Sequence, residues 1–199
     1  MDVVEAMKAL MGCELVDGAI QTHAILEEKD PAAKLKKLTI ADLNKGMLLL
    51  KVDEGRKIVR GKRKVVDCMS PLFSRDGNHD HNRACDAVLL RTVAPTEVEI
   101  YYIDLKSDKP TRYQGQFKST RCFMYYVQKL LADLLNVPMQ IKKERFILLH
   151  TDSSGGLPSM GKRPSWHTPA AANSVDTPYR KVVLDGDKIS WASIARSVG

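Results

Sequence analysis

Residues 85–106 read CDAVLLRTVAPTEVEIYYIDLK and carry the strongest structural pattern in the chain. Two runs rich in aliphatic and aromatic residues, 85–93 and 98–106, flank the short sequence APTE at 94–97. Runs of this kind, separated by a proline-containing turn, are typical of two neighbouring antiparallel strands. The sequence therefore predicts a β-hairpin over these residues.

The register of the hairpin brings two acidic residues together. Facing positions in an antiparallel pair sum to a constant, which is about 190 when the turn centres near residue 95, so Asp86 faces Asp104. Lys106 follows Asp104 by two positions, and both side chains therefore point to the same face. Facing carboxylates repel each other unless a cation compensates. That cation can be Lys106 or a divalent metal ion.

The acid pair predicts a magnesium site. Carboxylate oxygens are the ligands that Mg²⁺ and Mn²⁺ prefer, and the backbone carbonyl of Leu105 can add a third oxygen to those of Asp86 and Asp104. A metal ion held there can generate a hydroxide nucleophile and neutralise charge on a phosphodiester. Lys106 can orient the attacking water or stabilise the transition state. The alternative is an ordinary strand end with solvated charges, because Asp and Lys two residues apart also occur by chance.

Hydrophobic periodicity predicts two helices outside the hairpin. Apolar residues recur at three- and four-residue steps over 2–12 and over 119–136, as in amphipathic helices. Ser119 or Thr120 is the predicted N-cap of the second helix, and residues 107–116 are predicted as a loop. The apolar face of that helix is formed by Phe123, Val127, Leu130, Leu131 and Leu134.

Short apolar runs predict the remaining strands. They lie at 47–52, near 63–69 and at 145–151. The sequence also allows a short helix at 31–37 and another at 39–46, the latter beginning at a Thr39 cap. Together with the hairpin, these elements predict an α/β fold with a mixed sheet (α+β).

The chain changes character after residue 152. Residues 153–178 are rich in Gly, Pro, Ser and Ala, which predicts a long loop. Residues 179–191 contain an Asp-Gly turn between apolar runs, which predicts a hairpin. We therefore expect a core domain over 1–152 and an extension over 153–199, through which a second copy or a partner subunit can dock.

The bulk composition favours a soluble protein with an anionic partner. The chain has 199 residues, a formal net charge of +7 and a pI of about 9.2. A basic balance points first to nucleic acid, the alternative being a merely soluble protein. No apolar run approaches the roughly 20 residues of a membrane helix. The N-terminal sequence carries Asp2 and Glu5 where a signal peptide has bases, so we expect a cytoplasmic protein with reduced cysteines.

Basic and amide residues after the hairpin are candidates for nucleic-acid binding. Lys118 and Arg121 are expected at the start of the helix, where free amides also favour phosphate, and Tyr113 and Phe117 could stack on bases. A second basic run at 56–64 can contact phosphates or can be a charged edge strand. The candidates are Arg112, Gln116, Lys118, Arg121, Arg60 and Lys62. No Gly-x4-Gly-Lys-Ser/Thr motif occurs, which argues against a P-loop nucleotidase.

A zinc site is considered and not expected. Cys68, His79, His81 and Cys85 are zinc-type ligands, but their spacing matches no standard zinc pattern. His79 and His81 lie in the segment that leads into Asp86, so they are accessory candidates for the site around the acid pair.

An acid at the start of one strand, Asp-x-Lys at the end of the next, and then a helix and a strand resemble the PD-(D/E)XK nuclease superfamily. The resemblance covers about residues 60–152 and implies a restriction-endonuclease-like α-β-β-β-α-β core that cuts DNA or RNA with Mg²⁺. It implies Asp86, Asp104 and Leu105 as metal ligands and Asp86, Asp104 and Lys106 as catalytic residues. The strand near 63–69 would be the first of the core.

The chain departs from the family in several positions. Cys85 precedes the first acid, Asp104 replaces the commoner Glu, and no Gln is followed by Tyr four residues later, so no branch is assigned. A further acid from the N-terminal region, often present in the family, would be one of Glu5, Glu14, Glu27 and Glu28. The resemblance implies an endonuclease or exonuclease, as an effector or subunit of a bacterial antiviral defence or restriction system. The alternative is an inactive nuclease-like protein that binds nucleic acid or assembles in a larger complex.

Overall fold

The computed structural model describes most of the chain. It covers residues 1–28, 32–55, 57–60, 63–66, 80–107, 111–151, 166–169 and 171–198, without the side chains of 54–55, 57–60 and 63–66. The helices are α1 (Val3–Leu10), α2 (Val52–Gly55), α3 (Tyr113–Leu135) and α4 (Trp191–Val198), with a 3-10 turn η1 (Asp80–Asn82). The strands are β1 (Glu14–Asp17), β2 (His23–Glu27), β3 (Lys37–Ala41), β4 (Met47–Lys51), β5 (Lys57–Arg60), β6 (Arg63–Val66), β7 (Ala87–Ala94), β8 (Glu97–Lys106), β9 (Gln140–His150), β10 (Trp166–His167), β11 (Tyr179–Val182) and β12 (Lys188–Ser190).

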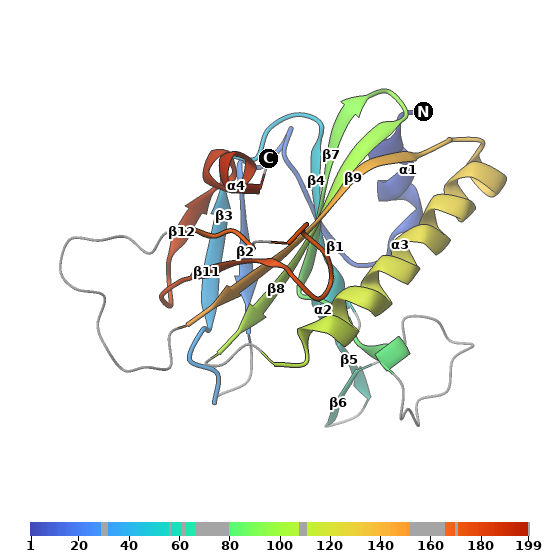
Figure 1. The fold of residues 1–199 in the computed structure, drawn as a ribbon. Coiled ribbons are helices and arrows are strands. Elements are labelled where there is room, and N and C mark those ends of the chain that lie inside the picture. Colours follow the sequence, from blue (N-terminus) through green and yellow to red (C-terminus); the bar gives the residue numbers. More distant parts are fainter. Residues whose placement is uncertain are drawn as a thin grey trace.

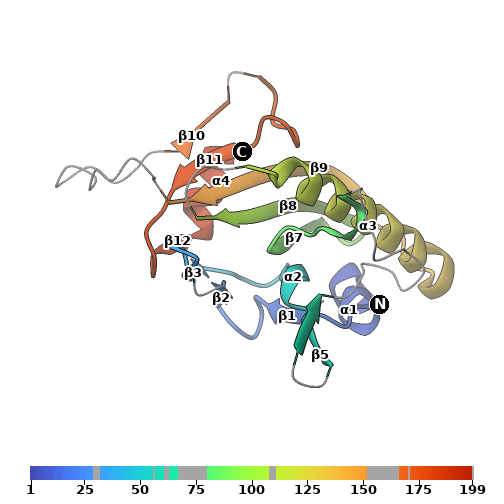
Figure 2. The same cartoon turned by 90° about the horizontal axis from the view of Figure 1, so that it is seen from below.

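A mixed seven-stranded sheet, in the order β1-β4-β7-β8-β9-β11-β10, forms the centre of the fold. β7 runs antiparallel to both β4 and β8, whereas β8, β9 and β11 run parallel to one another. Helices α1 and α3 lie on one side of this sheet, and a second sheet, β12-β3-β2, lies with α4 on the other (Figures 1 and 2). The predicted α/β class with a mixed sheet is confirmed.

Each face of the central sheet has its own hydrophobic core. Strand residues alternate between faces, so Ile100 and Tyr102 pack on the side of α1 and α3, while Tyr101 and Ile103 pack on the side of the second sheet and α4. β4 is buried along its whole length because both layers cover it. In the described ranges, no helix is both long and apolar enough to cross a membrane.

The predicted hairpin and its register are confirmed. Ala87 pairs with Ile103 and Thr92 pairs with Val98, so the pairs keep the expected constant up to an irregularity between Thr92 and Ala94. Asp86 directly precedes Ala87, which places it beside Asp104 at the end of the ladder.

Helix α3 begins earlier than expected. It spans 23 residues from Tyr113, and Arg112 occupies the N-cap with φ 61°, its side chain capping none of the described amides. The predicted loop over 107–116 is therefore wrong from residue 113 on. The extra turns form because Tyr113 and Phe117 are buried against the central sheet, at 4% and 0% exposure. Leu134, expected on the buried face, is 66% exposed.

Two further predictions near the N-terminus need correction. The strand expected near 63–69 is β6, which pairs with β5 in a separate two-stranded sheet, and β4 is the strand that pairs with β7. β4 has the sequence MLLLK and is apolar enough to lie between two layers, whereas β6 has the sequence RKVV and begins with two basic residues. The described residues 32–36 form no helix, and Thr39 lies in β3 rather than at a helix cap.

The C-terminal region forms no hairpin over 179–191. β11 pairs in parallel with β9, and β12 pairs in parallel with β3 in the other sheet. The Asp-Gly turn exists, with Gly186 at φ 83°, but it leads the chain from one sheet to the other. Helix α4, which the sequence did not predict, packs Trp191, Ile194 and Val198 into the core on that side.

Candidate active site

The acid pair lies where β7 begins and β8 ends. Asp86 precedes β7, and Asp104 and Lys106 are in the last three residues of β8. All three continue the alternation that places Val88 and Tyr102 on the α3 side of the sheet. The carboxyl ends of the parallel strands β8, β9 and β11 meet at this edge, which is where ligands commonly bind in α/β sheets.

Asp104 is a fully buried carboxylate with few partners. Its side chain is 0% exposed, and its Oδ2 lies 2.8 Å from Nζ of Lys106. Neither of its oxygens accepts a hydrogen bond from the described residues, and its contact with Lys106 is an ion pair. Burial and the neighbouring Asp86 raise the pKa of Asp104 well above its usual range.

Asp86 is held by the backbone of the facing strand. Its Oδ2 accepts a hydrogen bond of 2.6 Å from the amide of Leu105. Burial raises the pKa of Asp86, and the charge of Asp53 raises it further, while the Leu105 amide and Lys106 oppose that rise. Two carboxylates of raised pKa share this corner of the sheet, so a bound cation would stabilise both.

Asp53 is a third acid close to the pair, and it is not among the acids expected from the sequence. It lies in α2, directly after β4, and it acts on Asp86 electrostatically. A signal was present, since an acid directly following the apolar run of β4 belongs to the end of a buried strand. Of the expected acids, Glu5 pairs with Lys8 and Glu14 pairs with Lys51.

Gln116 lies beside Lys106. The Lys106 ammonium donates to Oε1 of Gln116, and Nε2 of Gln116 donates to the carbonyl of Ala84 at 3.0 Å. The lysine side chain is 18% exposed and therefore reaches solvent between the acid and the amide. Gln116 was predicted to bind nucleic acid, and the structure puts it in contact with the lysine of the site.

Helix α3 also holds the segment that leads into Asp86. Ser119 Oγ donates to the carbonyl of His81 at 2.9 Å, and Thr120 Oγ1 accepts from the amide of Cys85 at 2.9 Å. Gly115 makes room for Asp80, since a Cβ there would lie 2.3 Å from the Asp80 carboxyl group. The helix therefore holds the segment before Asp86 through residues on two successive turns.

The residues of the site fit a hard divalent cation. The carbonyl of Lys106 accepts from Thr151 on the β9 side, whereas the amide of Leu105 points to Asp86. Backbone groups alternate sides along a strand, so the Leu105 carbonyl points to the β7 side of β8, as its amide does. Two carboxylates, one of which accepts no hydrogen bond from the described residues, and one carbonyl can hold Mg²⁺, which retains several waters in proteins. Within the described chain, no three His, Cys, Asp or Glu side chains converge on a common metal position.

The basic candidates occupy different surroundings. Lys118 is 61% exposed and 3.9 Å from Asp176, and Arg121 is engaged by Glu144 at 2.7 Å. Both lie beyond the first turn of α3, which corrects their expected place at its start. Arg112 is exposed at the N-cap.

Tyr113 and Phe117 are core residues, which corrects their expected stacking on bases. The ring of Phe117 lies 5.4 Å from that of Phe146 and 5.9 Å from that of Tyr113. Their burial leaves no face of Phe117 open to a base.

Several predicted residues stay outside these contacts. Lys62, Cys68 and His79 lie outside the described residues, as does the side chain of Arg60 in β5. His81 lies in η1, tied by its carbonyl to α3. Cys85 is fully buried with its thiol donating to the carbonyl of Ala87 at 3.3 Å, and burial raises its pKa far above the ordinary value.

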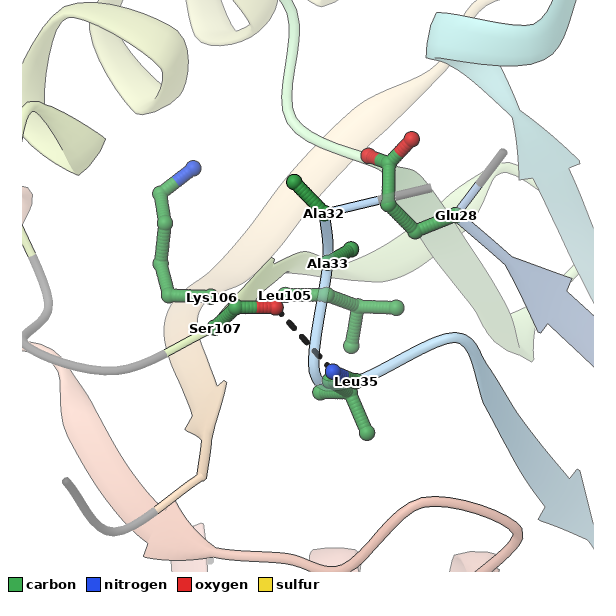
Figure 3. A pocket seen from close by; sticks show the side chains of 7 residues that line it. All are labelled: Glu28, Ala32, Ala33, Leu35, Leu105, Lys106 and Ser107. Atoms are coloured by element: carbon green, nitrogen blue, oxygen red, sulfur yellow. Dashed lines mark hydrogen bonds between the residues drawn. The ribbon is translucent and has the colours of Figure 1, made fainter. Parts of the chain in front are cut away.

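A pocket of about 270 Å³ lies beside the site, at the end of β8. Ser107 Oγ accepts from the amides of Lys34 and Leu35 at 2.9 and 3.0 Å, which holds the segment before β3 against this strand end. Figure 3 shows Lys106 and Glu28 on either side of Ala32 and Ala33. Glu28, one of the four expected acids, thus lines this pocket together with Lys106.

Comparison with known proteins adds no relative. No family model, curated protein or solved structure matches the chain.

Proposed function

We propose that the chain is a metal-dependent nuclease that hydrolyses phosphodiester bonds of DNA or RNA. The observation that carries the proposal is the buried Asp104 carboxylate, which accepts no hydrogen bond from the described residues, lies beside Asp86 and is 2.8 Å from the Lys106 ammonium. Burying a charged group so incompletely paired is costly. A bound cation would offset that cost, and cation binding would explain why the carboxylate is buried there.

The order of elements supports the same reading. Helix α1, strands β4, β7 and β8, helix α3 and strand β9 follow one another along the chain with other elements inserted, and the four strands are adjacent in the sheet. This is the α-β-β-β-α-β order of the PD-(D/E)XK superfamily, with β4 in the place expected for residues 63–69. The likeness concerns arrangement and is an argument from analogy.

Asp86, Asp104 and the Leu105 carbonyl would hold Mg²⁺ or Mn²⁺. The metal ion would supply Lewis-acid activation of water and neutralise charge on the scissile phosphate. Lys106, fixed between Asp104 and Gln116, would orient the attacking water and stabilise negative charge in the transition state. Gln116 would keep the lysine at that position through its own hydrogen bond to Ala84.

The experiment is a cleavage assay on plasmid DNA and on RNA with Mg²⁺ or Mn²⁺. Cleavage is expected for the wild-type chain and for Asp133→Asn, a matched acid that pairs with Lys129 on the outer face of α3. Cleavage should be lost in Asp104→Asn and Lys106→Ala. Equal cleavage by all four proteins would show that the site does not act.

The second candidate is a nucleic-acid-binding protein of the same fold without catalysis. It is favoured by one observation, the absence of three converging ligand side chains among the described residues. Salt-dependent binding of nucleic acid by a wild-type chain that cuts neither substrate would support it.

A further inference from the structure

The strand registers place Arg180 in one row with the acid pair. Asp104 on β8 pairs with Leu148 on β9, and Leu148 pairs with Arg180 on β11. Directly paired residues of parallel strands share a face, and Leu148 packs on the α3 side. Asp86, Asp104, Leu148 and Arg180 therefore cross the sheet on the face that carries the candidate site.

The side chain of Arg180 is held by Tyr113. Its guanidinium donates to the hydroxyl of Tyr113 at 3.0 Å and lies 5.6 Å from the centre of the Tyr113 ring. The Tyr113 hydroxyl in turn donates to the carbonyl of Asp176. The ion pairs found among the described residues include none with Arg180. A half-buried guanidinium that stacks on a ring, with donors left over, is suited to a phosphate group.

The neighbouring His150 is less suited to binding a phosphate group. It pairs with Lys106 one row further along the same face, and its Nδ1 lies 3.0 Å from the carbonyl of Thr151. That contact favours the proton on Nδ1, so Nε2 of the neutral ring is an acceptor and cannot donate to a phosphate. An arginine side chain, by contrast, carries five N–H donors and no acceptor.

We propose that Arg180 binds a second backbone phosphate of the substrate strand, adjacent to the phosphate at the acid pair. The inference rests on the proposed nuclease function. Neighbouring strands are about 4.8 Å apart, so the backbones of Asp104 and Arg180 are separated by about 10 Å across β9. Arg180 thus lies too far away to take the place of Lys106 and close enough to hold the same nucleic-acid chain.

The test is oligonucleotide binding over a range of NaCl concentrations. A 5′-fluorescein single-stranded oligonucleotide is titrated with the full chain in EDTA, and anisotropy gives Kd. Removing one phosphate contact should weaken binding about tenfold and make the slope of log K against log salt shallower by about 0.7. We expect this for Arg180→Gln and a wild-type slope for Arg180→Lys. Arg196→Gln on α4, which changes the charge equally at an exposed position, should match the wild type.

The outcomes separate this proposal from the nuclease itself. A wild-type slope in Arg180→Gln, or weaker binding with no change of slope, overturns the phosphate contact and leaves Arg180 as a structural link to Tyr113. A shallower slope in Arg180→Lys also overturns it, and this variant retains the charge should the Gln variant misfold. If the wild-type chain cuts nucleic acid and Arg180→Gln has the same KM as the wild type, the phosphate contact of Arg180 is overturned and the nuclease proposal stands. A wild-type chain that neither binds the oligonucleotide nor cuts plasmid DNA or RNA with Mg²⁺ or Mn²⁺ overturns both proposals, and one that cuts without binding it overturns the inference alone.

Discussion

Glu144 and Asp104 lie on adjacent strands, on the same face of the central sheet, yet their surroundings are opposite. Glu144 accepts hydrogen bonds from the hydroxyls of Tyr102 and Tyr125 at 2.9 and 3.0 Å and from Nε of Arg121. Asp104, more deeply buried, accepts none from the described residues and has one ion pair with Lys106. The Glu144 carboxylate has hydrogen-bond partners on both oxygens, and the Asp104 carboxylate has none among the described residues.

This comparison indicates that the buried charge of Glu144 stabilises the fold, whereas that of Asp104 does not. A fully satisfied polar network strengthens and specifies a structure, whereas an unsatisfied buried carboxylate costs stability. The Glu144 cluster fastens α3 to β9 without any outside group. In the proposed nuclease, a bound metal ion would supply the interaction that Asp104 lacks among the described residues.

The largest expected effect separates activity from stability at Asp104. Asp104→Asn should lower the cleavage rate by about a thousandfold or more, since the proposed metal ligand and its charge are lost. The same change should raise the free energy of unfolding by about 1–2 kcal/mol, because a buried charge becomes a neutral amide. Cleavage kinetics and urea unfolding measure the two. A variant that is less stable than the wild type would contradict the contrast.

Glu144→Ala should have the opposite outcome. It removes the acceptor of Tyr102, Tyr125 and Arg121, so unfolding should become easier by about 2–3 kcal/mol, less than for a fully buried pair because Arg121 is partly exposed. The cleavage rate per folded molecule should stay within about twofold, because Glu144 lies away from the acid pair. Urea unfolding and a single-turnover assay at low temperature check both. A large loss of rate in folded protein would place Glu144 in the site.

Magnesium should stabilise the wild type and Glu144→Ala but not Asp104→Asn. A ligand at ten times its Kd adds about 1.4 kcal/mol to the free energy of unfolding. Thermal unfolding with and without MgCl₂, with CaCl₂ for comparison, measures the shift in Tm. An equal shift in Asp104→Asn would mean that the ion binds elsewhere.

The smallest effect is expected at Asp17, an acid with its partners in place. The Ala19 amide, followed by Lys8, lowers the pKa of Asp17 below its ordinary value of 3.8. A lowered pKa contributes stability above the unfolded value that is lost as pH falls through the folded one. Asp17→Asn should therefore cost about 0.5 kcal/mol at pH 7 and nothing near pH 2. Urea unfolding at both pH values tests this, and an effect that persists unchanged at pH 2 would exclude the electrostatic cause.

The sequence was most informative where structure is local. The alternation around Pro95 encodes the hairpin, and the register follows from the turn alone, which is why Asp86 and Asp104 could be paired in advance. Lys106 followed from the two-residue period of a strand. These residues need no knowledge of the rest of the chain.

The remainder of the site depends on contacts between distant segments. Gln116 reaches Lys106 only because α3 starts at Tyr113, and that start depends on burial against β9 rather than on a capping residue. Asp53 joins Asp86 through the pairing of β4 with β7, whose apolar pattern β6 shares in part. The Asp-Gly turn at Gly186 was correct, but the partners of the flanking strands lie in two different sheets.

The pairing of β12 with β3 has a consequence for the order of folding. The amide of Lys36 bonds to the carboxylate of Asp185 across a separation of 149 residues, and Ile189 pairs with Ile40 beside it. Contacts so distant in sequence close late, after the loops between them have been ordered. During synthesis from the N-terminus, the layer behind β8 stays open until β12 and α4 have left the ribosome. The hairpin that carries the acid pair can form early, but the layer that packs behind it is complete only when residues 185–198 have been added.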